Sequence, residues 1–211
     1  MSKSSHNQDL VLASSSQYRR ELLATLSIPF RVVPPDIDES PKQGENANVL
    51  VERLARAKAQ VVGRQETNSL IIGSDQVAIY AGEIIGKPSD REEAIYQLEL
   101  ISNRTAKLLT CVTVLNMFTG RTQIETVLTL ITFKALSRTR IELYLDADKP
   151  YDCCGSVRVE GLGVTLFKSM QSEDPTSVIG LPMIALTSML EKEGIDPLIS
   201  ATPRASEPDP Q

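Results

Sequence analysis

The chain has 211 residues, of which 41% are hydrophobic and 23% are charged, as is typical of a globular protein with a buried core. Its formal net charge of −5 excludes general attraction to nucleic acid or an anionic membrane, so a bound anion would need a local cluster of basic side chains. No apolar run is long enough to span a bilayer, and the start, MSKSSHNQDLVLASSS, lacks the apolar core of a signal peptide, so we expect a cytoplasmic protein.

The cysteines and the single histidine limit the available chemistry. Cys111 and the adjacent Cys153 and Cys154 have no C-x-x-C spacing, and neighbouring cysteines seldom form a disulfide because the small ring is strained. We therefore expect free thiols. The only histidine, His6, lies in a polar leader, which excludes a Ser-His-Asp triad and a histidine-based zinc site for the rest of the chain. Catalysis would rest on carboxylates, lysines, arginines and hydroxyls.

The N-terminal part predicts a strand, a turn and a helix. Residues 10–13 read as a short buried strand, residues 14–16 as a polar turn, and residues 17–26 as a helix with leucines on its inner face. A second strand is predicted over residues 30–33. The following segment, PPDIDESPKQGEN, is a predicted loop, because its prolines, acids and glycine disfavour regular structure. A loop of this length in a compact domain is often functional.

The segment ANVLVERLARAKAQVVGR predicts the clearest helix. Its apolar side chains recur at Leu50, Leu54, Ala57 and Val61, the spacing of one helical face, with the arginines and the lysine on the other faces. Residues 70–80 then predict a strand that is interrupted by GSD. The segment EIIGKP returns the chain as a short strand.

The middle of the chain predicts another helix and a long hairpin. Ser89 and Glu92 have capping-box spacing, which indicates a helix over residues 90–100. Residues 107–117 and 122–134 are rich in Thr, Val, Ile and Leu and are joined by FTGR, so they predict two long strands of a hairpin.

The C-terminal part continues the mixture of helices and strands. Ser137 is the predicted cap of a helix, residues 156–159 and 164–167 predict short strands, and residues 181–193 predict a final helix. We expect one α/β domain over residues 10–198, with a central mixed sheet flanked by helices and a cleft. Its predicted flanks are a flexible leader, 1–9, and a proline-rich disordered tail, 199–211.

The segment ASSSQYRRELL is the first candidate binding feature. Its serines and the first amides of a helix lie together at the end of a strand, with Arg19 and Arg20 one turn further on. Such helix starts bind phosphate, because their N–H groups are free and the helix dipole is positive there. In an alternative interpretation the serines only cap the helix and the arginines are solvated.

The segment IIGSDQVAIYAGEIIGKP places an acid within an apolar strand. Asp75 interrupts the strand, Gly73 permits close backbone approach, and Lys87 follows on the returning strand. An acid in such a place costs stability unless it is paired, which makes Asp75 a catalytic candidate. Alternatively, Asp75 ends the strand in a salt bridge with a lysine, and Lys87 is a plain turn residue.

Two further features could contribute to a site. The loop acids Asp36, Asp38 and Glu39 could hold Mg²⁺ through carboxylate oxygens, which that hard cation prefers, although acidic surface loops are usually just solvated. Lys58 lies between two alanines on the long predicted helix, and these small residues leave room for another group to approach. By itself it is an ordinary helix lysine.

Five separated motifs together resemble the Maf family in order and spacing. They are LVLASSSQYRRELL, DIDES, LARAKAQ, IIGSDQV with GEIIGKP, and CGSVRVEGLG followed by VIGLP. Several motifs in the right order are far more specific than any one of them. The resemblance implies a Maf/ITPase-like fold and a nucleoside triphosphate pyrophosphatase. Such an enzyme cleaves between the α- and β-phosphates with a divalent cation, Mg²⁺ or Mn²⁺.

The resemblance also implies an active cleft that contains Ser14, Ser16, Arg19, Glu39, Lys58, Asp75 and Lys87. In a chemically sensible division of roles, Asp75 is the general base for water, and Glu39 and Asp75 lie near the metal. Arg19, Lys58 and Lys87 would neutralise the triphosphate and the developing diphosphate charge, while the two serines donate hydrogen bonds to phosphate oxygens.

The motif GSDQV, in place of GADTV, resembles the branch of the family that acts on 7-methyl-GTP. Tyr18, Gln76 and Glu160 match the specificity positions of that branch. The chemistry fits, because N7-methylated guanine is cationic. An aromatic face attracts it by cation–π stacking, and a carboxylate accepts its N1 and N2 protons. Each of these side chains could otherwise serve local packing or satisfy backbone groups.

Some positions depart from the family pattern. Gln17 replaces a common proline, and SNRTAKLLTC stands where many members read SGRTH followed by a Thr-Gly pair, so Asn103, Ala106 and Cys111 affect local backbone geometry. None of these departures removes a proposed catalytic group, so we expect activity to survive.

Two other functions remain open from the sequence. One is the UTP and dTTP branch of the same family, which Gln76 and Tyr18 disfavour. The other is a non-catalytic nucleotide-binding regulator of septum formation, which the presence of Asp75, Lys58 and Lys87 disfavours. The expected partner is a small-molecule nucleotide, with neither nucleic acid nor a membrane. The resemblance is also compatible with a homodimer, which no surface pattern in the sequence establishes.

Overall fold

The computed structural model describes residues 8–201, with side chains described as far as residue 199. The chain forms a seven-stranded mixed sheet in the order β2-β1-β3-β5-β6-β7, with β4 paired to β3 off this path. The strands are β1 (Asp9–Ala13), β2 (Arg31–Val32), β3 (Ser69–Tyr80), β4 (Glu83–Ile85), β5 (Thr105–Asn116), β6 (Thr122–Phe133) and β7 (Phe167–Ser172). β1 is parallel to both β2 and β3, and the remaining pairs within residues 8–201 are antiparallel. The predicted mixed α/β domain is confirmed.

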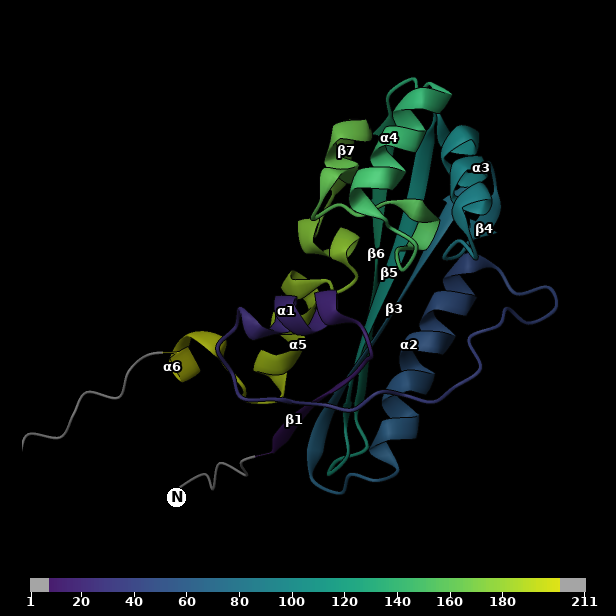
Figure 1. Ribbon diagram of the computed structural model, residues 1–211. Helices are drawn as coiled ribbons and strands as arrows, with labels where there is room; N and C mark the ends of the chain where they lie inside the picture. The colour runs from purple at the N-terminus through teal and green to yellow at the C-terminus, as the bar shows by residue number, and fades with distance from the viewer. Residues whose placement is uncertain (1–7, 202–211) are drawn as a thin grey trace, which may run out of the picture.

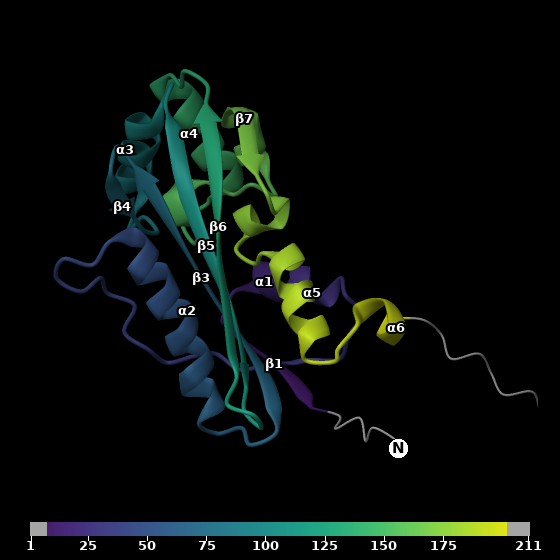
Figure 2. The same ribbon diagram turned by 180° about the vertical axis from the view of Figure 1, so that it is seen from behind.

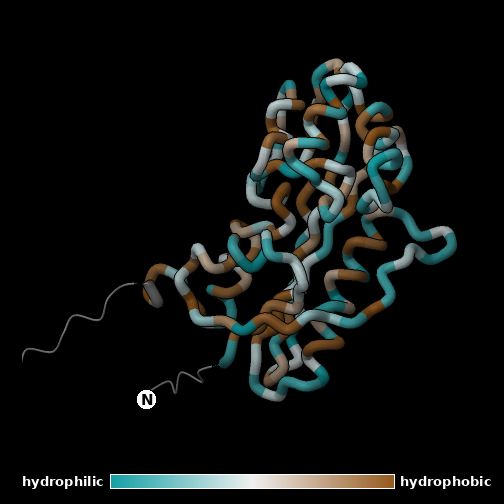
Figure 3. The backbone as a smooth tube through the Cα atoms, viewed as in Figure 1, coloured by the Kyte–Doolittle hydropathy of each residue, from teal (hydrophilic) through white to brown (hydrophobic). Residues whose placement is uncertain are grey.

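Helices cover both faces of the sheet (Figures 1 and 2). They are α1 (Gln17–Ala24), α2 (Ala47–Gly63), α3 (Arg91–Ile101), α4 (Arg138–Asp148), α5 (Met183–Lys192) and α6 (Pro197–Ala201), with short 3₁₀ turns η1 (Cys154–Ser156), η2 (Leu162–Leu166) and η3 (Pro175–Ile179). α2 packs on one face, while α1 and α5 lie on the opposite face and α3 and α4 cover the far end (Figures 1 and 2). The loop between β2 and α2 is largely hydrophilic, as the sequence predicts (Figure 3).

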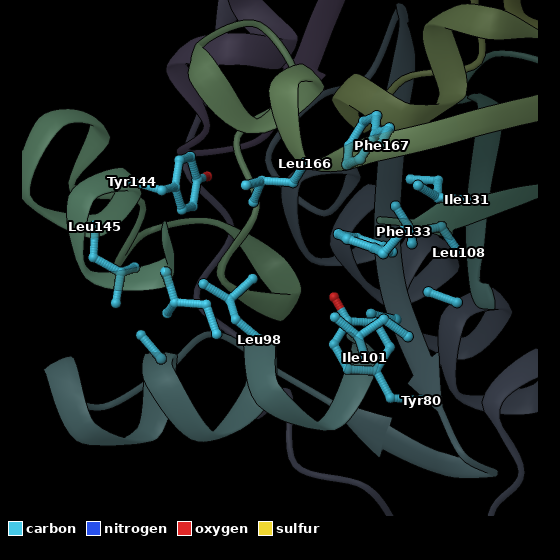
Figure 4. Close-up of a cluster of buried hydrophobic side chains, with 14 of the residues drawn as sticks. Tyr80, Leu98, Ile101, Leu108, Ile131, Phe133, Tyr144, Leu145, Leu166 and Phe167 are labelled. Carbon is cyan, nitrogen blue, oxygen red and sulfur yellow. The ribbon is translucent and has the colours of Figure 1, made fainter. Parts of the chain in front are cut away.

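Alternate residues of β3 face different layers, because side chains alternate along a strand. Leu70 and Ile72 join the cluster beneath α1 and α5, whereas Ile71 joins the cluster beneath α2. Further along the same strand, Ala78 and Tyr80 enter the cluster beneath α3 and α4 (Figure 4). One continuous strand therefore connects three parts of the core. The predicted interruption at GSD is wrong, since β5 pairs with β3 through this segment.

Gly73 allows α2 to lie very close to β3. A Cβ at this position would be 2.2 Å from the carbonyl oxygen of Ala55 and 2.9 Å from the amide nitrogen of Ala59. Only glycine fits such a close backbone approach. The same approach buries Lys58, so the expectation that this lysine lies on a different face of the helix from the buried residues is wrong.

The helix ends follow the expected capping chemistry, with one change. Ser137 caps α4, as predicted, by accepting a hydrogen bond from the amide of Arg140. At the start of α3, however, the cap is Asp90, which accepts from the amide of Glu93. The carboxylate of Glu93 accepts from the amide of Ser89 at 2.7 Å. The N-cap therefore lies one residue beyond the predicted one, and the amide that Glu93 satisfies belongs to the residue before the N-cap.

The segment after α4 differs from the prediction. Residues 156–159 do not form a strand, and residues 164–167 lie mostly in η2, with the strand beginning only at Phe167. Gly155 and Ser156 have φ angles of 67° and 59°, in the left-handed region, which an extended strand does not contain. The chain turns back there instead of extending.

The predicted domain limits of 10–198 are close to those of the described elements. Asp9 already belongs to β1, and α6 extends through Ala201. The predicted flexible leader and disordered tail otherwise fall on residues outside the described range, as does His6. Between residues 8 and 201, none of the helices combines the length and the apolar character needed to cross a bilayer.

We predict that Gly73→Ala lowers the free energy of unfolding by about 1–3 kcal/mol, because the added methyl group must displace the backbone of α2. Urea denaturation measures this change. Gly86→Ala is the matched control, since a Cβ there meets no atom within 4 Å, and we expect a change within about 0.5 kcal/mol. Equal stability of the two variants would contradict the close approach of α2.

Candidate active site

A cleft of about 750 Å³ opens along one edge of β3. β1 pairs with β3 only as far as Gly73, and β4 pairs with it only from Ala78 onward, which leaves the intervening edge without a strand neighbour in the described chain. The chain leaves the edge of β3 after β1, where α1 begins, and β4 pairs with β3 only beyond this gap. The cleft thus lies beyond the carboxyl end of β1, where ligands commonly bind in α/β proteins.

The tertiary structure brings nearly all predicted site residues together. Those that line the cleft are Ser16, Tyr18, Arg19, Glu39, Lys58, Asp75, Gln76, Lys87 and Glu160. Ser14 is the exception, because it is buried and does not line the cleft. Its hydroxyl accepts a hydrogen bond from the amide of Ser16 at 3.1 Å, so it shapes the turn.

The turn before α1 presents other hydroxyls to the cleft. Ser15 is exposed and lines the cleft, although the sequence did not single it out from its neighbours. Ser16 is the N-cap and accepts from the amide of Arg19. Because a hydroxyl that accepts can still donate, Ser16 can also donate to an anion. The helix start therefore offers donors suited to phosphate oxygens.

Lys58 holds two carboxylates together at the centre of the cleft. Its Nζ is 2.6 Å from Oδ1 of Asp75 and 2.9 Å from Oε1 of Glu39. Lys58 and Asp75 are each only 5% exposed, whereas the side chain of Glu39 is 56% exposed. Burial raises the pKa of Asp75, while the positive charges of Lys58 and Arg19 oppose this rise. The alternative interpretation of Asp75, a salt bridge with a lysine, thus describes a real contact.

A backbone carbonyl group holds the side chain of Arg19 in place. Its Nε donates to the carbonyl oxygen of Gly180 at 2.7 Å. Burial lowers the pKa of Arg19, and the nearby carboxylates of Asp75 and Glu39 raise it. The terminal nitrogens of the guanidinium group can donate to an anion while Nε stays anchored.

The wall of the cleft also contains Tyr18 and Glu160. The hydroxyl of Tyr18 donates to Oδ2 of Asp152 across 3.4 Å, and it also interacts with the guanidinium group of Arg158. Arg158 is held in turn by the buried carboxylate of Asp148. Burial raises the pKa of both Tyr18 and Glu160. The sequence missed Arg158, whose only signal was a cation in the otherwise apolar run before Glu160.

Gln76 lines the cleft, but its amide nitrogen donates hydrogen bonds to other groups of the protein. Nε2 lies 2.9 Å from Oγ1 of Thr110, 2.9 Å from the carbonyl oxygen of Ser177 and 3.2 Å from that of Val178. These contacts agree with the alternative in which Gln76 satisfies neighbouring polar groups.

The loop that carries Glu39 is anchored by an arginine on α2. Arg53 donates to the carboxylate of Glu45 through Nε at 2.6 Å and to the carbonyl oxygen of Ser40 at 3.0 Å. The hydrogen bonds from Arg53 lower the pKa of Glu45 to about 2. Among the loop acids, Asp36 and Asp38 do not line the cleft. The sequence did not indicate Arg53, because its partners depend on the path of the loop.

The three cysteines are free, as predicted. Cys153 and Cys154 line the cleft, whereas Cys111 is buried in β5 opposite Asp75. Burial raises the pKa of Cys154 to about 11, and its Sγ donates to the carbonyl oxygen of Ile85 at 3.1 Å. A thiol with this pKa is protonated at neutral pH, so it is a poor nucleophile.

Most of the departures from the family pattern lie away from the cleft. Ala106 is buried in the core beneath α3, and Asn103 occupies a left-handed turn with a φ of 55°, a conformation that asparagine tolerates. Neither these residues nor Cys111 line the cleft. Gln17 does line it, and its amide donates to Glu21 at 2.7 Å.

The donor set suits a hard divalent cation that shares its ligands with a substrate. In residues 8–201, no group of three or more His, Cys, Asp or Glu side chains could hold a metal ion. Glu39 and Asp75 lie close to each other because Nζ of Lys58 contacts one oxygen of each, and the second oxygen of each carboxylate is not part of these ion pairs. Mg²⁺ is typically held by one or two carboxylates together with phosphate oxygens and water, and two carboxylates match that pattern.

Comparison with known proteins gives one family and many relatives. The family model described as Maf-like protein matches residues 9–193. The chain is 47% identical over 188 residues to the 7-methyl-GTP pyrophosphatase of Pseudomonas aeruginosa, covering 89% of this chain and 98% of that protein. It is 50% identical over 186 residues to the protein of the same name from Pseudomonas syringae pv. tomato, covering 88% and 97%.

Among solved structures, the Staphylococcus aureus Ham1 protein aligns with a TM-score of 0.48 and 14% sequence identity. The alignment covers 88% of this chain and 100% of that chain.

We predict that Lys58→Met destabilises the fold by about 3–5 kcal/mol at neutral pH, because Asp75 is left as a buried charge without its closest cation. The double variant Lys58→Met/Asp75→Asn should recover most of this loss, since it removes both charges. Urea denaturation of the three proteins provides the test. Arg31→Met is the control, because it breaks an ion pair of 2.8 Å at the surface, in which the arginine side chain is 52% exposed, and it should change stability little. If Lys58→Met were as stable as the wild type, this result would argue against the buried ion pair.

Proposed function

Since this chain belongs to the Maf family, we propose that it is a nucleoside triphosphate pyrophosphatase that converts 7-methyl-GTP to 7-methyl-GMP and diphosphate. The names of its relatives support this substrate. The observation that carries the proposal is the contact of Lys58 with Asp75 and Glu39 inside a cleft that also contains Arg19 and Lys87. Carboxylates that can accept a proton thus lie beside cations that can bind a polyphosphate.

In the proposed reaction, Asp75 is the general base. A water molecule gives a proton to the Asp75 carboxylate, and its oxygen bonds to the α-phosphorus of the α–β anhydride. The bridging P–O bond breaks with its electron pair, and diphosphate leaves. Burial raises the pKa of Asp75, which makes it a stronger base than an ordinary carboxylate, while Lys58 favours its ionised form. Because Lys58 contacts Oδ1, the other carboxylate oxygen can accept from the water.

The cations and the helix start are proposed to bind the triphosphate. Arg19, Lys58 and Lys87 offset its negative charge and the charge that develops on the departing diphosphate. Ser15 and Ser16, together with the first amides of α1, donate hydrogen bonds to phosphate oxygens. Ser14 supports this arrangement by holding the turn through its bond with Ser16.

Glu39 and Asp75 are the proposed ligands of a divalent cation, Mg²⁺ or Mn²⁺. When bound, such a cation neutralises phosphate oxygens and lowers the pKa of water. Glu39 is suited to this role because it is exposed to incoming ions, whereas Arg53 holds its loop in place.

Tyr18 and Glu160 are the proposed recognition groups for the methylated base. The ring of Tyr18 attracts the cationic 7-methylguanine, and the carboxylate of Glu160 accepts hydrogen bonds from N–H groups at the edge of the base. Asp152, beside Tyr18, adds negative charge to the same wall. Gln76 affects specificity through the neighbouring segment it contacts, since its amide nitrogen donates to Val178 and Ser177.

The partner that this reaction requires is a small-molecule nucleotide. We also propose that the protein acts in the cytoplasm, where nucleoside triphosphates are made and used. A homodimer stays a prediction from the family resemblance.

We predict that the purified protein releases diphosphate from 7-methyl-GTP faster than from GTP, dTTP, UTP or CTP, and only with Mg²⁺ or Mn²⁺ present. Asp75→Asn should lower kcat by about 100-fold or more, because the general base is lost. Asp36→Asn serves as the control, since this loop acid does not line the cleft and should retain activity. Circular dichroism checks that both variants are folded.

Other outcomes have clear meanings. Preference for dTTP or UTP would overturn the assignment of Tyr18, Gln76 and Glu160 but keep the mechanism. Nucleotide binding without turnover would instead favour a regulator. Full activity of Asp75→Asn would remove Asp75 as the base.

We predict an acid limb in the pH profile of kcat/KM, with its midpoint above the ordinary aspartate pKa of 3.8. The base must be ionised, so activity falls as the pH drops through the raised pKa of Asp75. Lys58→Met should move this limb to higher pH, because Lys58 lowers that pKa. Steady-state kinetics across the acid range measure both midpoints. A limb that stays in place in the variant would show that a different group titrates.

A further inference from the structure

Ser74 lies on the face of β3 opposite to Asp75 and connects the strand to a distant segment. Its Oγ is 2.7 Å from the carbonyl oxygen of Gly180 and 2.8 Å from that of Cys111, so one hydroxyl proton is shared between two acceptors. Ser74 is fully buried. A buried hydroxyl with two such contacts fixes its partners firmly, because no water competes for them.

Gln76, two residues further along the same face, holds the other end of that segment. Its amide nitrogen donates to the carbonyl oxygens of Ser177 and Val178. The hydroxyl of Thr110 on β5 also donates to Ser177 at 2.8 Å. Side chains from two strands therefore secure the backbone of residues 177–180, which form the end of η3 and its C-cap, Gly180.

The same segment anchors Arg19. The carbonyl oxygen of Gly180 accepts from Nε of Arg19 at 2.7 Å as well as from Ser74. Gly180 has a φ of 110°, and a Cβ there would be 3.2 Å from Nε of Arg19, so the backbone and the guanidinium group are in close contact. Ser74 and Arg19 thus share one acceptor, and the position of that acceptor sets the direction of the guanidinium group.

We propose that Ser74 and Gln76 are positioning residues that act through residues 177–180 to orient Arg19 toward a bound polyphosphate. The proposal rests on the proposed function, in which Arg19 binds the triphosphate. An arginine side chain loses rotamer freedom when it binds a ligand, and an anchored Nε reduces this entropic cost before the ligand arrives. Release of the Gly180 carbonyl would restore that freedom and weaken binding.

The test is a double-mutant cycle with inorganic tripolyphosphate as the probe, without added divalent cation, measured by isothermal titration calorimetry. Ser74→Ala and Gln76→Leu should each raise Kd by about tenfold, the effect of a lost charge-assisted hydrogen bond. In the Arg19→Ala background, the same changes should alter Kd by less than about twofold, because the group they position is absent. A merely structural role would not produce this coupling.

Thr113→Val is the matched control. It removes a buried hydroxyl from β5 that makes no hydrogen bond to residues 177–180, and Kd should not change. Weakening by either Ser74→Ala or Gln76→Leu that disappears without Arg19 supports the proposal. The proposal is overturned if both variants bind tripolyphosphate as the wild type does, or if their weakening persists in full without Arg19. It is also overturned if Arg19→Ala itself binds as the wild type does. Failure to hydrolyse 7-methyl-GTP is a separate result, since tripolyphosphate binding needs neither the base nor turnover.

Discussion

The buried ion pair of Lys58 and Asp75, with 2.6 Å between Nζ and Oδ1, is the interaction on which the cleft depends. Removal of either charge from water is costly, and the pair is tolerable only because the two groups are very close. That closeness requires α2 to touch β3, and Gly73 permits it by leaving no side chain between them. A glycine two residues before the acid thus controls the electrostatics of the site.

The two faces of β3 carry different groups of site contacts. One face presents Asp75 to Lys58 on α2, and the other presents Ser74 and Gln76 to residues 177–180. Because β1 and β4 leave a gap along this strand, both groups of contacts meet at one open edge. A chain with a net charge of −5 can in this way bring several cations to one anion site, since α1, α2 and the segment that follows β4 each supply one.

Much of the fold was predictable from local pattern. The long hairpin of β5 and β6, the helix α2 and the Ser137 cap follow from residue alternation, helical spacing and a hydroxyl at a helix start. The predictions failed where the local sequence was compatible with two different backbone conformations or caps. Asp90 took the cap that Ser89 was expected to provide, and the left-handed turn at Gly155 replaced a strand, because contacts with other elements decided between similar local energies.

The sequence by itself determined which side chains were candidates for the chemistry, since an acid inside an apolar strand and hydroxyls before a helix are recognisable from their neighbours. Only the tertiary structure decided what each side chain does. It buried Lys58, turned Ser14 away from the cleft and engaged Gln76 with Val178, a residue 102 positions away. Such contacts join segments that share no local pattern, so their geometry depends on how the whole sheet and its helices pack.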